Sequence, residues 1–142
     1  MQTIFILLLS IIVDVLNPTS IEKEPETVTI SVTVPNVTSA QGKVIFGLHN
    51  EETFISRIPL QLEKSSINDK EAKVVFKNIP AGEYAIICFH DKNNNGVMDF
   101  EPNGMPIENY GASNNVMNFG PPRYYDTKFE VSDKDVSLEI RF

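Results

Sequence analysis

The chain has 142 residues and a formal net charge of -7, and its pI is about 4.8. This acidity argues against binding to the phosphate backbone of nucleic acid and against docking on anionic lipid, because both need a basic face. The length fits one domain of ordinary size. Cys88 is the only cysteine, so no disulfide can form within the chain, and its apolar neighbours predict a buried thiol.

The N-terminus carries an apolar run from Ile4 to Val13. The run is too short to span a membrane and is typical of a signal-peptide core. We therefore expect residues 1–20 to be a signal peptide, residues 21–26 a polar spacer, and the protein to be exported, to the periplasm, the cell surface or the medium. No Lys or Arg precedes the run, so an uncleaved N-terminal anchor is the alternative. After removal of the leader, no membrane span is expected.

The first three predicted strands follow the spacer. Residues 27–34 (TVTISVTV) alternate polar and apolar side chains, as in a half-buried strand. Residues 42–49 (GKVIFGLH) predict a second strand. Residues 53–61 (TFISRIPLQ) are a weaker candidate, and Pro59 favours an edge strand or a strand end there.

The rest of the chain contains four more predicted strands and one long loop. Two strands, residues 72–77 and 84–90, flank a turn at Pro80 and Gly82, and the second is apolar on both faces, as expected of a central strand. Residues 91–123 show no periodicity. The last two strands are predicted in YYDTKFEV and DVSLEIRF. About seven short strands predict an all-β fold, an antiparallel β-sandwich, that forms a single domain over residues 27–142.

The segment FKNIPAGEYAI, residues 76–86, resembles the strand-turn-strand signature of prealbumin-like (transthyretin-like) sandwiches and carboxypeptidase regulatory-like domains. The continuation FHDKNNNGVMDFEPNGMPIENYGASNN with FGPPRYYDTKFEV is similar to the bacterial family catalogued as domain of unknown function 2141. The resemblance covers about residues 27–142. It implies an exported prealbumin-like sandwich whose biochemical role is unassigned. Some transthyretin-like proteins are 5-hydroxyisourate hydrolases with a Tyr-Arg-Gly-Ser-type tail, whereas this chain ends in LEIRF, so that activity is not expected.

The long loop carries the pattern of a calcium-binding loop. Its residues fall as D-x-N-x-N-G-x-x-D, which matches the first nine places of an EF-hand-type loop. In such a loop alternate side-chain oxygens converge on one point, a glycine turns the chain, and one backbone carbonyl contributes. The expected ligands are Asp91, Asn93, Asn95, Val97 through its carbonyl, Asp99 and Glu101.

The match breaks at the twelfth place, where Pro102 replaces the closing glutamate. Either Glu101 or Glu108 could close the shell, and the few carboxylates predict weak calcium binding, with a dissociation constant on the order of 10⁻⁴ M. The alternative is a solvated turn, because Asn-Gly is a strong turn signal by itself. We favour the calcium site, since a turn does not require acids at both Asp91 and Asp99.

Other candidate sites are weaker. His49 and His90 could join Asp91 or Glu108 in a zinc or catalytic group, but both lie at predicted strand ends, where histidines are commonly structural. No nucleophile-elbow pattern or Cys-His arrangement is present, so no catalytic residue is assigned. The aromatic residues of the loop could form a binding platform, although we favour their packing against the sandwich; they are Tyr110, Phe119, Tyr124 and Tyr125.

The sequence therefore predicts an exported, non-enzymatic β-sandwich module with a calcium-binding loop. Its partner would be an envelope or extracellular protein or a carbohydrate. The alternatives are a carbohydrate- or peptide-binding surface protein that uses the loop aromatics, and a small metal-dependent hydrolase that uses the two histidines.

Overall fold

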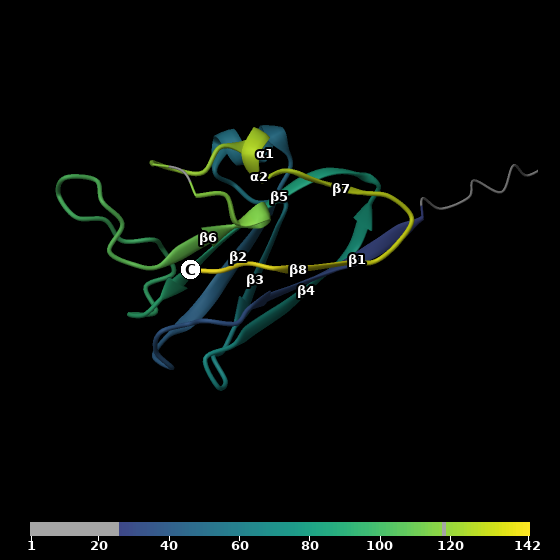
Figure 1. The fold of residues 1–142 in the computed structure, drawn as a ribbon. Helices are drawn as coiled ribbons and strands as arrows, with labels where there is room; N and C mark the ends of the chain where they lie inside the picture. Colours follow the sequence, from purple (N-terminus) through teal and green to yellow (C-terminus); the bar gives the residue numbers. More distant parts are fainter. Residues whose placement is uncertain (1–25, 118) are drawn as a thin grey trace, which may run out of the picture.

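The computed structural model describes residues 26–117 and 119–142, so the predicted signal peptide and most of the spacer lie outside the described residues. Two β-sheets face each other, and two short helices lie together at one end (Figure 1). In chain order the elements are β1 (Thr27–Val34), β2 (Lys43–His49), α1 (Glu51–Ser56), β3 (Gln61–Ser65), β4 (Ala72–Pro80), β5 (Gly82–Asp91), β6 (Tyr110–Ala112), the 3-10 turn η1 (Ser113–Asn115), α2 (Tyr124–Thr127), β7 (Phe129–Val131) and β8 (Val136–Glu139).

The predicted β-sandwich is confirmed. One sheet has the strand order β4-β1-β8, and the other has the order β3-β2-β5-β6, with β7 paired to the beginning of β5. All neighbouring strands are antiparallel except β1 and β8, which run parallel with Ile30 opposite Val136. The parallel pair β1–β8 therefore departs from the predicted antiparallel arrangement at this one edge.

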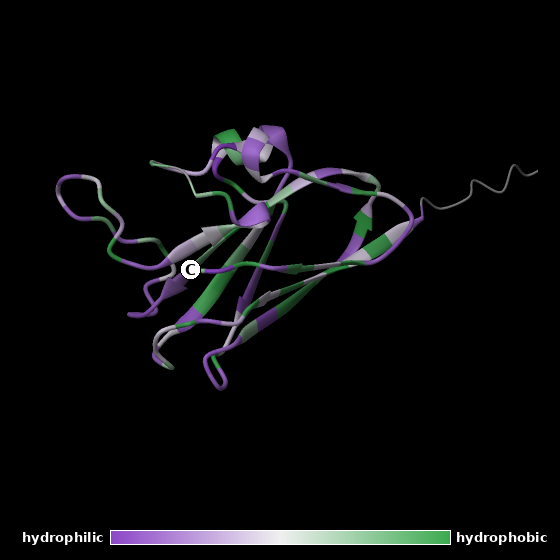
Figure 2. Cartoon of the chain, viewed as in Figure 1, coloured by the Kyte–Doolittle hydropathy of each residue, from purple (hydrophilic) through white to green (hydrophobic). Residues whose placement is uncertain are grey.

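The core follows the alternation in the sequence. In β1 the four apolar residues at even positions are buried and the Thr and Ser residues between them are more exposed, because successive side chains of a strand point to opposite faces. Figure 2 shows the hydrophobic residues concentrated along the strands, most continuously along β2. In the central strand β5, Ile86 and Cys88 belong to the core between the sheets, and Ala85 is buried on the opposite face. The Cys88 thiol is buried as predicted, and its burial raises its pKa, so it stays a thiol rather than a reactive thiolate.

At the predicted turn the structure has a bend at Ala81, which joins strands of the two sheets, and the positive φ lies at Asn78 and not at Gly82. Only Ala81 separates β4 from β5, which belong to different sheets. The Tyr84 hydroxyl donates to the carbonyl of Pro80 over 2.9 Å, so this ring fixes the crossing from one sheet to the other.

Two predicted strands are in part helical. Residues 51–56 form α1 and the third strand begins only at Gln61. Asn50 starts the helix because its side chain accepts the N–H of Thr53 (2.9 Å) while the Thr53 hydroxyl accepts the N–H of Asn50 (3.0 Å), a reciprocal cap that satisfies two otherwise unpaired donors. Likewise residues 124–127 of the predicted strand YYDTKFEV form the single turn α2.

Candidate calcium loop

The candidate site is built on Asp91, the last residue of β5. Its side chain is fully buried, and its two carboxylate oxygens accept the backbone N–H groups of Asn95 and Gly96, each over 3.0 Å. Gly96 has a φ of +81°, a value that glycine adopts without strain. The Lys43 ammonium, on the neighbouring strand β2, lies 3.6 Å from the carboxylate. The loop therefore turns around a buried carboxylate that lysine partly neutralises.

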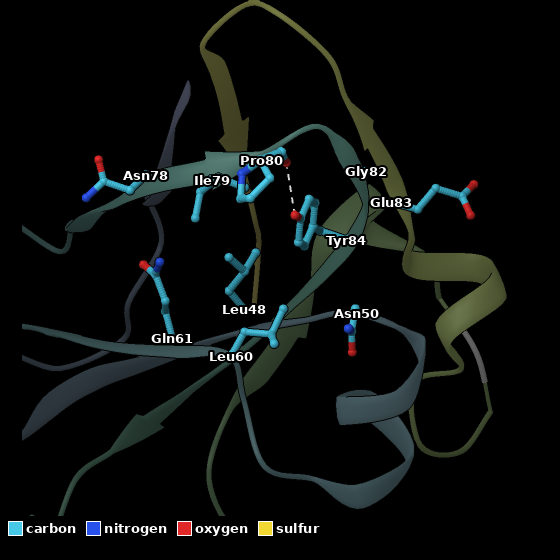
Figure 3. Close-up of a pocket in the computed structure, with 10 residues that line it drawn as sticks. All are labelled: Leu48, Asn50, Leu60, Gln61, Asn78, Ile79, Pro80, Gly82, Glu83 and Tyr84. Atoms are coloured by element: carbon cyan, nitrogen blue, oxygen red, sulfur yellow. Dashed lines mark hydrogen bonds between the residues drawn. The ribbon is translucent and has the colours of Figure 1, made fainter. Parts of the chain in front are cut away.

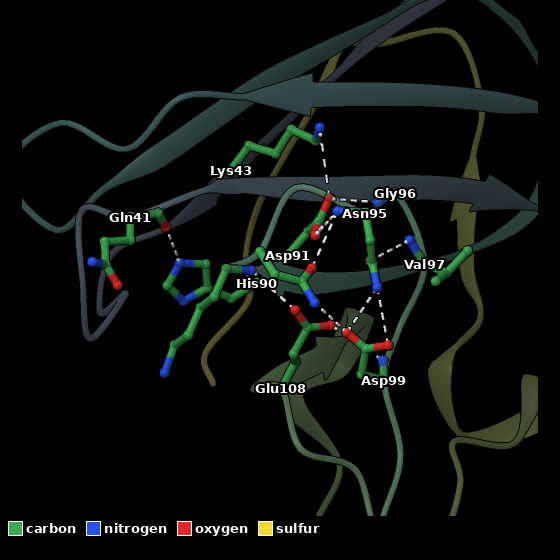
Figure 4. Close-up of polar contacts among 11 residues, drawn as sticks. Gln41, Lys43, His90, Asp91, Asn95, Gly96, Val97, Asp99 and Glu108 are labelled. Atoms are coloured by element: carbon green, nitrogen blue, oxygen red, sulfur yellow. Dashed lines mark hydrogen bonds and ion pairs between the residues drawn. The ribbon is translucent and has the colours of Figure 1, made fainter.

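Three further side chains of the predicted set, Asn93, Asn95 and Asp99, bond to one another within the same turn. Figure 4 shows Asn95 and Asp99 close to Asp91 and Glu108. The Asp99 carboxylate accepts the side-chain amide of Asn93 over 2.8 Å and that of Asn95 over 2.9 and 3.0 Å. The three side chains lie together, as the spacing predicts, but amide nitrogens rather than the expected oxygens of Asn93 and Asn95 point at Asp99. The structure also explains this proximity, because the turn held by Asp91 brings residues 93 and 95 back toward residue 99.

The amide oxygens of the two asparagines face the backbone. Asn93 Oδ1 accepts the N–H of Asn95 over 3.1 Å, and Asn95 Oδ1 accepts the N–H of Val97 over 3.1 Å. The amide nitrogens, which are donors only, therefore point at Asp99. A cation at Asp99 requires both amides to rotate so that their oxygens face the ion.

Glu108 lies at the base of the loop, whereas Glu101 does not. Glu108 is 5% exposed, and its carboxylate accepts the N–H of Lys92 over 3.0 Å and that of Asp99 over 3.2 Å. Glu101 is exposed, and its N–H bonds to the carbonyl of Met105 over 2.8 Å in a small hairpin beyond the turn. Of the two acids considered for closing the shell, Glu108 is the one that contacts the backbone of Asp99.

The donor set suits a hard cation with oxygen ligands. Within residues 26–117 and 119–142, no group of three or more His, Cys, Asp and Glu side chains is close enough to hold a metal ion. The ligands at this loop would accordingly be a mixture of carboxylate and amide oxygens. Calcium accepts such ligands and tolerates irregular geometry, whereas zinc prefers nitrogen and sulfur.

Lys43 and Glu108 complete the surroundings of the loop, and neither is in the predicted ligand set. Lys43 reaches Asp91 because the two residues are opposite each other in the β2–β5 register. The sequence gives no direct signal for that pairing, since 47 intervening residues contain other strands. Glu108 is recognisable only as one of two candidate acids, and its burial decides between them.

The two histidines lie at opposite ends of the second sheet. His49 is opposite Ala85, and His90 is opposite Val44, so five residues of β2, about 17 Å, separate their positions. His90 Nε2 donates to the carbonyl of Gln41 over 2.7 Å, while burial lowers the pKa of His49. The hydrolase alternative needed both histidines at one place, and the strand register does not bring them together.

Of the four aromatic residues considered as a platform, Tyr110 pairs with Phe89 as part of β6, and the other three divide into two groups. Tyr124 packs edge to face on Phe54, with ring centroids 5.6 Å apart, and its hydroxyl donates to the carbonyl of Glu83 over 3.1 Å. Phe119 is fully exposed and Tyr125 is 81% exposed. The preferred interpretation, packing against the sandwich, is therefore wrong for Phe119 and Tyr125.

Comparison with known proteins gives one match. The family described as "Uncharacterized protein conserved in bacteria (DUF2141)" matches residues 32–139. No curated protein and no solved structure matches the chain significantly. Among the helices that the structure describes, none is long and apolar enough to cross a membrane.

Proposed function

The chain belongs to the uncharacterised bacterial family DUF2141, and on that premise we propose that it is an exported, non-enzymatic β-sandwich module that binds calcium at the β5–β6 loop. The apolar run from Ile4 to Val13 supports export. One observation carries the calcium proposal: the side chains of Asn93, Asn95 and Asp99 lie together in the turn that the buried carboxylate of Asp91 holds.

The proposed ion lies beside Asp99, within reach of the two asparagine amides. The Asp99 carboxylate would lose its hydrogen bonds from the side-chain amides of Asn93 and Asn95 and bind the divalent cation instead. The two amides would turn their oxygens to the ion and would no longer accept the N–H groups of Asn95 and Val97. Asp91 keeps its role of holding the turn through Asn95 and Gly96. The rotation costs local hydrogen bonds, which agrees with weak affinity, on the order of 10⁻⁴ M.

Calorimetric titration with calcium tests this proposal. We expect one site per chain in the wild type, with magnesium binding more weakly because it demands near-ideal octahedral geometry. Asp99→Asn should reduce the affinity at least about tenfold, since it removes the negative charge nearest the ion. Asp133→Asn is the matched control, because this exposed acid lies in another loop and its side chain bonds only to Ser132 within the described structure.

The side-chain amide signals of the asparagines in NMR spectra provide a local readout. Calcium should shift the Nδ2 resonances of Asn93 and Asn95 more than those of Asn36, whose side chain bonds to the backbone of Phe142 far along the chain. Absence of binding at millimolar calcium, or an unchanged affinity in Asp99→Asn, would contradict the proposal.

A second candidate function is binding of a carbohydrate or peptide at the exposed aromatic residues. Phe119 lines a shallow hollow of about 330 Å³ together with Gly120, Pro121 and Arg123, and Tyr125 lies exposed on α2 with the Lys128 ammonium 5.0 Å from its ring centroid. Exposed rings are the groups on which sugars and peptides stack. Retardation of the protein in gels that contain soluble polysaccharide, and loss of the retardation in Phe119→Ser, would support this function.

A further inference from the structure

The strands β3 and β4 are the facing edges of the two sheets. They belong to different sheets, and no backbone ladder joins them. Two side chains bridge them instead: Gln61 Nε2 donates to the carbonyl of Lys77 over 3.0 Å, and the N–H of Lys73 donates to Ser65 Oγ over 3.1 Å. The bridged residues are four apart on each strand, Gln61 and Ser65 on β3 and Lys77 and Lys73 on β4, and they follow in opposite order. The two strands are therefore antiparallel. We call the line along which residues 61–65 and 73–77 face each other the β3–β4 seam.

The seam exposes backbone hydrogen-bonding groups of β4. The N–H of Lys73 and the carbonyl of Lys77 point into it, while the backbone groups of Ala72, Val74 and Phe76 point the other way, toward β1. Because N–H and C=O groups alternate sides along a strand, both backbone groups of Val75, midway between the bridges, also point into the seam. The Val75 side chain is 44% exposed and lies on the outer face of β4, beside this stretch of edge.

The seam opens at one end into a pocket of about 450 Å³ (Figure 3). Its apolar part is formed by Leu48, Leu60, Ile79, Pro80 and Tyr84, and its polar lining includes Asn50, Gln61 and Asn78. In Figure 3 the labelled Glu83 points away from the other side chains. Asn78, which lines the pocket, has a φ of +58° and lies where the pairing of β4 with β1 shifts register. The pocket volume is large enough for an apolar side chain.

The charge along the seam is opposite to that of the whole protein. Three lysines, Lys64, Lys73 and Lys77, are exposed along the two strands, in a chain with a net charge of -7. Lys73 pairs with Glu71 over 2.7 Å, whereas no ion pair involves Lys64 or Lys77 in the part of the chain that the structure describes. Lysines on an edge strand oppose pairing with a second copy of the same edge, but they attract an acidic strand.

We infer that the β3–β4 seam binds an extended acidic peptide, which adds as a strand to β4 and places an apolar side chain in the pocket. The peptide backbone bonds to the free N–H and C=O of Val75, and its carboxylates meet Lys64 and Lys77. Cα atoms of β3 and β4 come within 8 Å of each other. An inserted strand needs about twice the strand spacing of 4.8 Å, so the Gln61 and Ser65 bridges must break and the two strands must separate by at least roughly 2 Å.

Fluorescence anisotropy with a labelled peptide, Glu-Val-Glu-Val-Glu-Leu, tests this inference. We expect saturable binding to the wild type that weakens at least about tenfold in the double variant Lys64→Glu, Lys77→Glu. Lys134→Glu is the matched control, since Lys134 is exposed in the β7–β8 connection, away from the seam. The corresponding peptide with Lys in place of Glu should bind at least about tenfold more weakly than the acidic one.

Two further probes test for backbone pairing. Val75→Pro removes the outward N–H and should abolish binding, while a melting curve shows whether the variant is folded. An acidic peptide whose backbone nitrogens are methylated at alternate residues tests the same point without changing the protein. Methylation removes the N–H donors along one edge of the peptide, so that edge cannot donate hydrogen bonds to β4. No binding at millimolar peptide, or equal binding of the methylated peptide, would overturn the inference, as would a dimer through this edge that excludes the peptide.

Discussion

Gly42 shows how closely one residue is constrained at the base of the candidate calcium loop. It has a φ of +73° and lies against the backbone that leaves β5, where an added Cβ would contact the carbonyl of Asp91 and lie 2.7 Å from Lys92 Cα. We expect Gly42→Ala to lower the free energy of unfolding by about 3 kcal/mol, because backbone strain adds to overpacking against atoms that cannot rotate away. Urea denaturation measures this loss.

Gly104 is the matched control for that substitution. Its φ is +84°, but no atom lies within 4 Å of an added Cβ. Gly104→Ala should therefore cost only the backbone strain, about 1 kcal/mol. Equal losses in the two variants would contradict a close approach of Gly42 to the Asp91–Lys92 backbone.

His49 makes stability depend on pH. Burial lowers its pKa in the folded state, so the unfolded chain, with a histidine pKa of about 6.5, binds the proton more readily. The contribution of His49 is thus fully present above pH 6.5 and is lost as the pH falls below that value. Between pH 7.5 and 5.5 the melting temperature of the wild type should fall more steeply than that of His49→Gln, and equal slopes would exclude this role.

At the scale of the element, α1 depends on its first residue. No side chain of α1 itself is fully buried, and the reciprocal hydrogen bonds between Asn50 and Thr53 fix the start of the helix. Asn50→Ala should reduce the free energy of unfolding by about 1 kcal/mol, whereas Asn50→Asp, which still accepts the N–H of Thr53, should stay within about 0.5 kcal/mol of the wild type. Urea denaturation of the two variants tests whether Asn50 caps the helix. If Asn50 were only a loop residue, both variants would lose the same free energy of unfolding.

The strands could be predicted where one face is buried, and α1 shows why a sequence can mislead elsewhere. In β1 the alternation of side chains matches burial residue by residue. In residues 53–61 the apolar side chains imitate that pattern, but Ile55 is 78% and Ile58 is 70% exposed, so burial does not determine the local structure. The cap at Asn50 determines it, and its Asn-x-x-Thr form lacks the Glu or Gln that would have made it recognisable.

At the scale of the whole molecule, short-range features of the site were predictable and long-range ones were not. The convergence of Asn93, Asn95 and Asp99 follows from spacing within one turn of chain. The contact between Lys43 and Asp91 depends on the register of β2 against β5, and the β3–β4 seam depends on how two sheets meet. Such features arise from packing of the complete sandwich, which periodicity in a single sequence does not encode.

The net charge of -7 and the buried Asp91 carboxylate give the loop a general electrostatic preference for cations. The Lys43 ammonium is one such positive charge beside Asp91. A bound ion stabilises the fold only to the extent that it binds the folded state more tightly than the unfolded chain. With a dissociation constant on the order of 10⁻⁴ M, 1 mM calcium would contribute about 1.4 kcal/mol. The whole-molecule consequence is a measurable rise in thermal stability.

The melting temperature with and without 1 mM calcium, for the wild type and Asp99→Asn, tests the proposed calcium loop most directly. We predict that calcium raises the melting temperature of the wild type by about 5 °C and that of Asp99→Asn by no more than about 1.5 °C, because a tenfold weaker site contributes only about 0.4 kcal/mol. A wild-type melting curve that calcium does not move, or an equal rise in both proteins, would contradict the calcium loop.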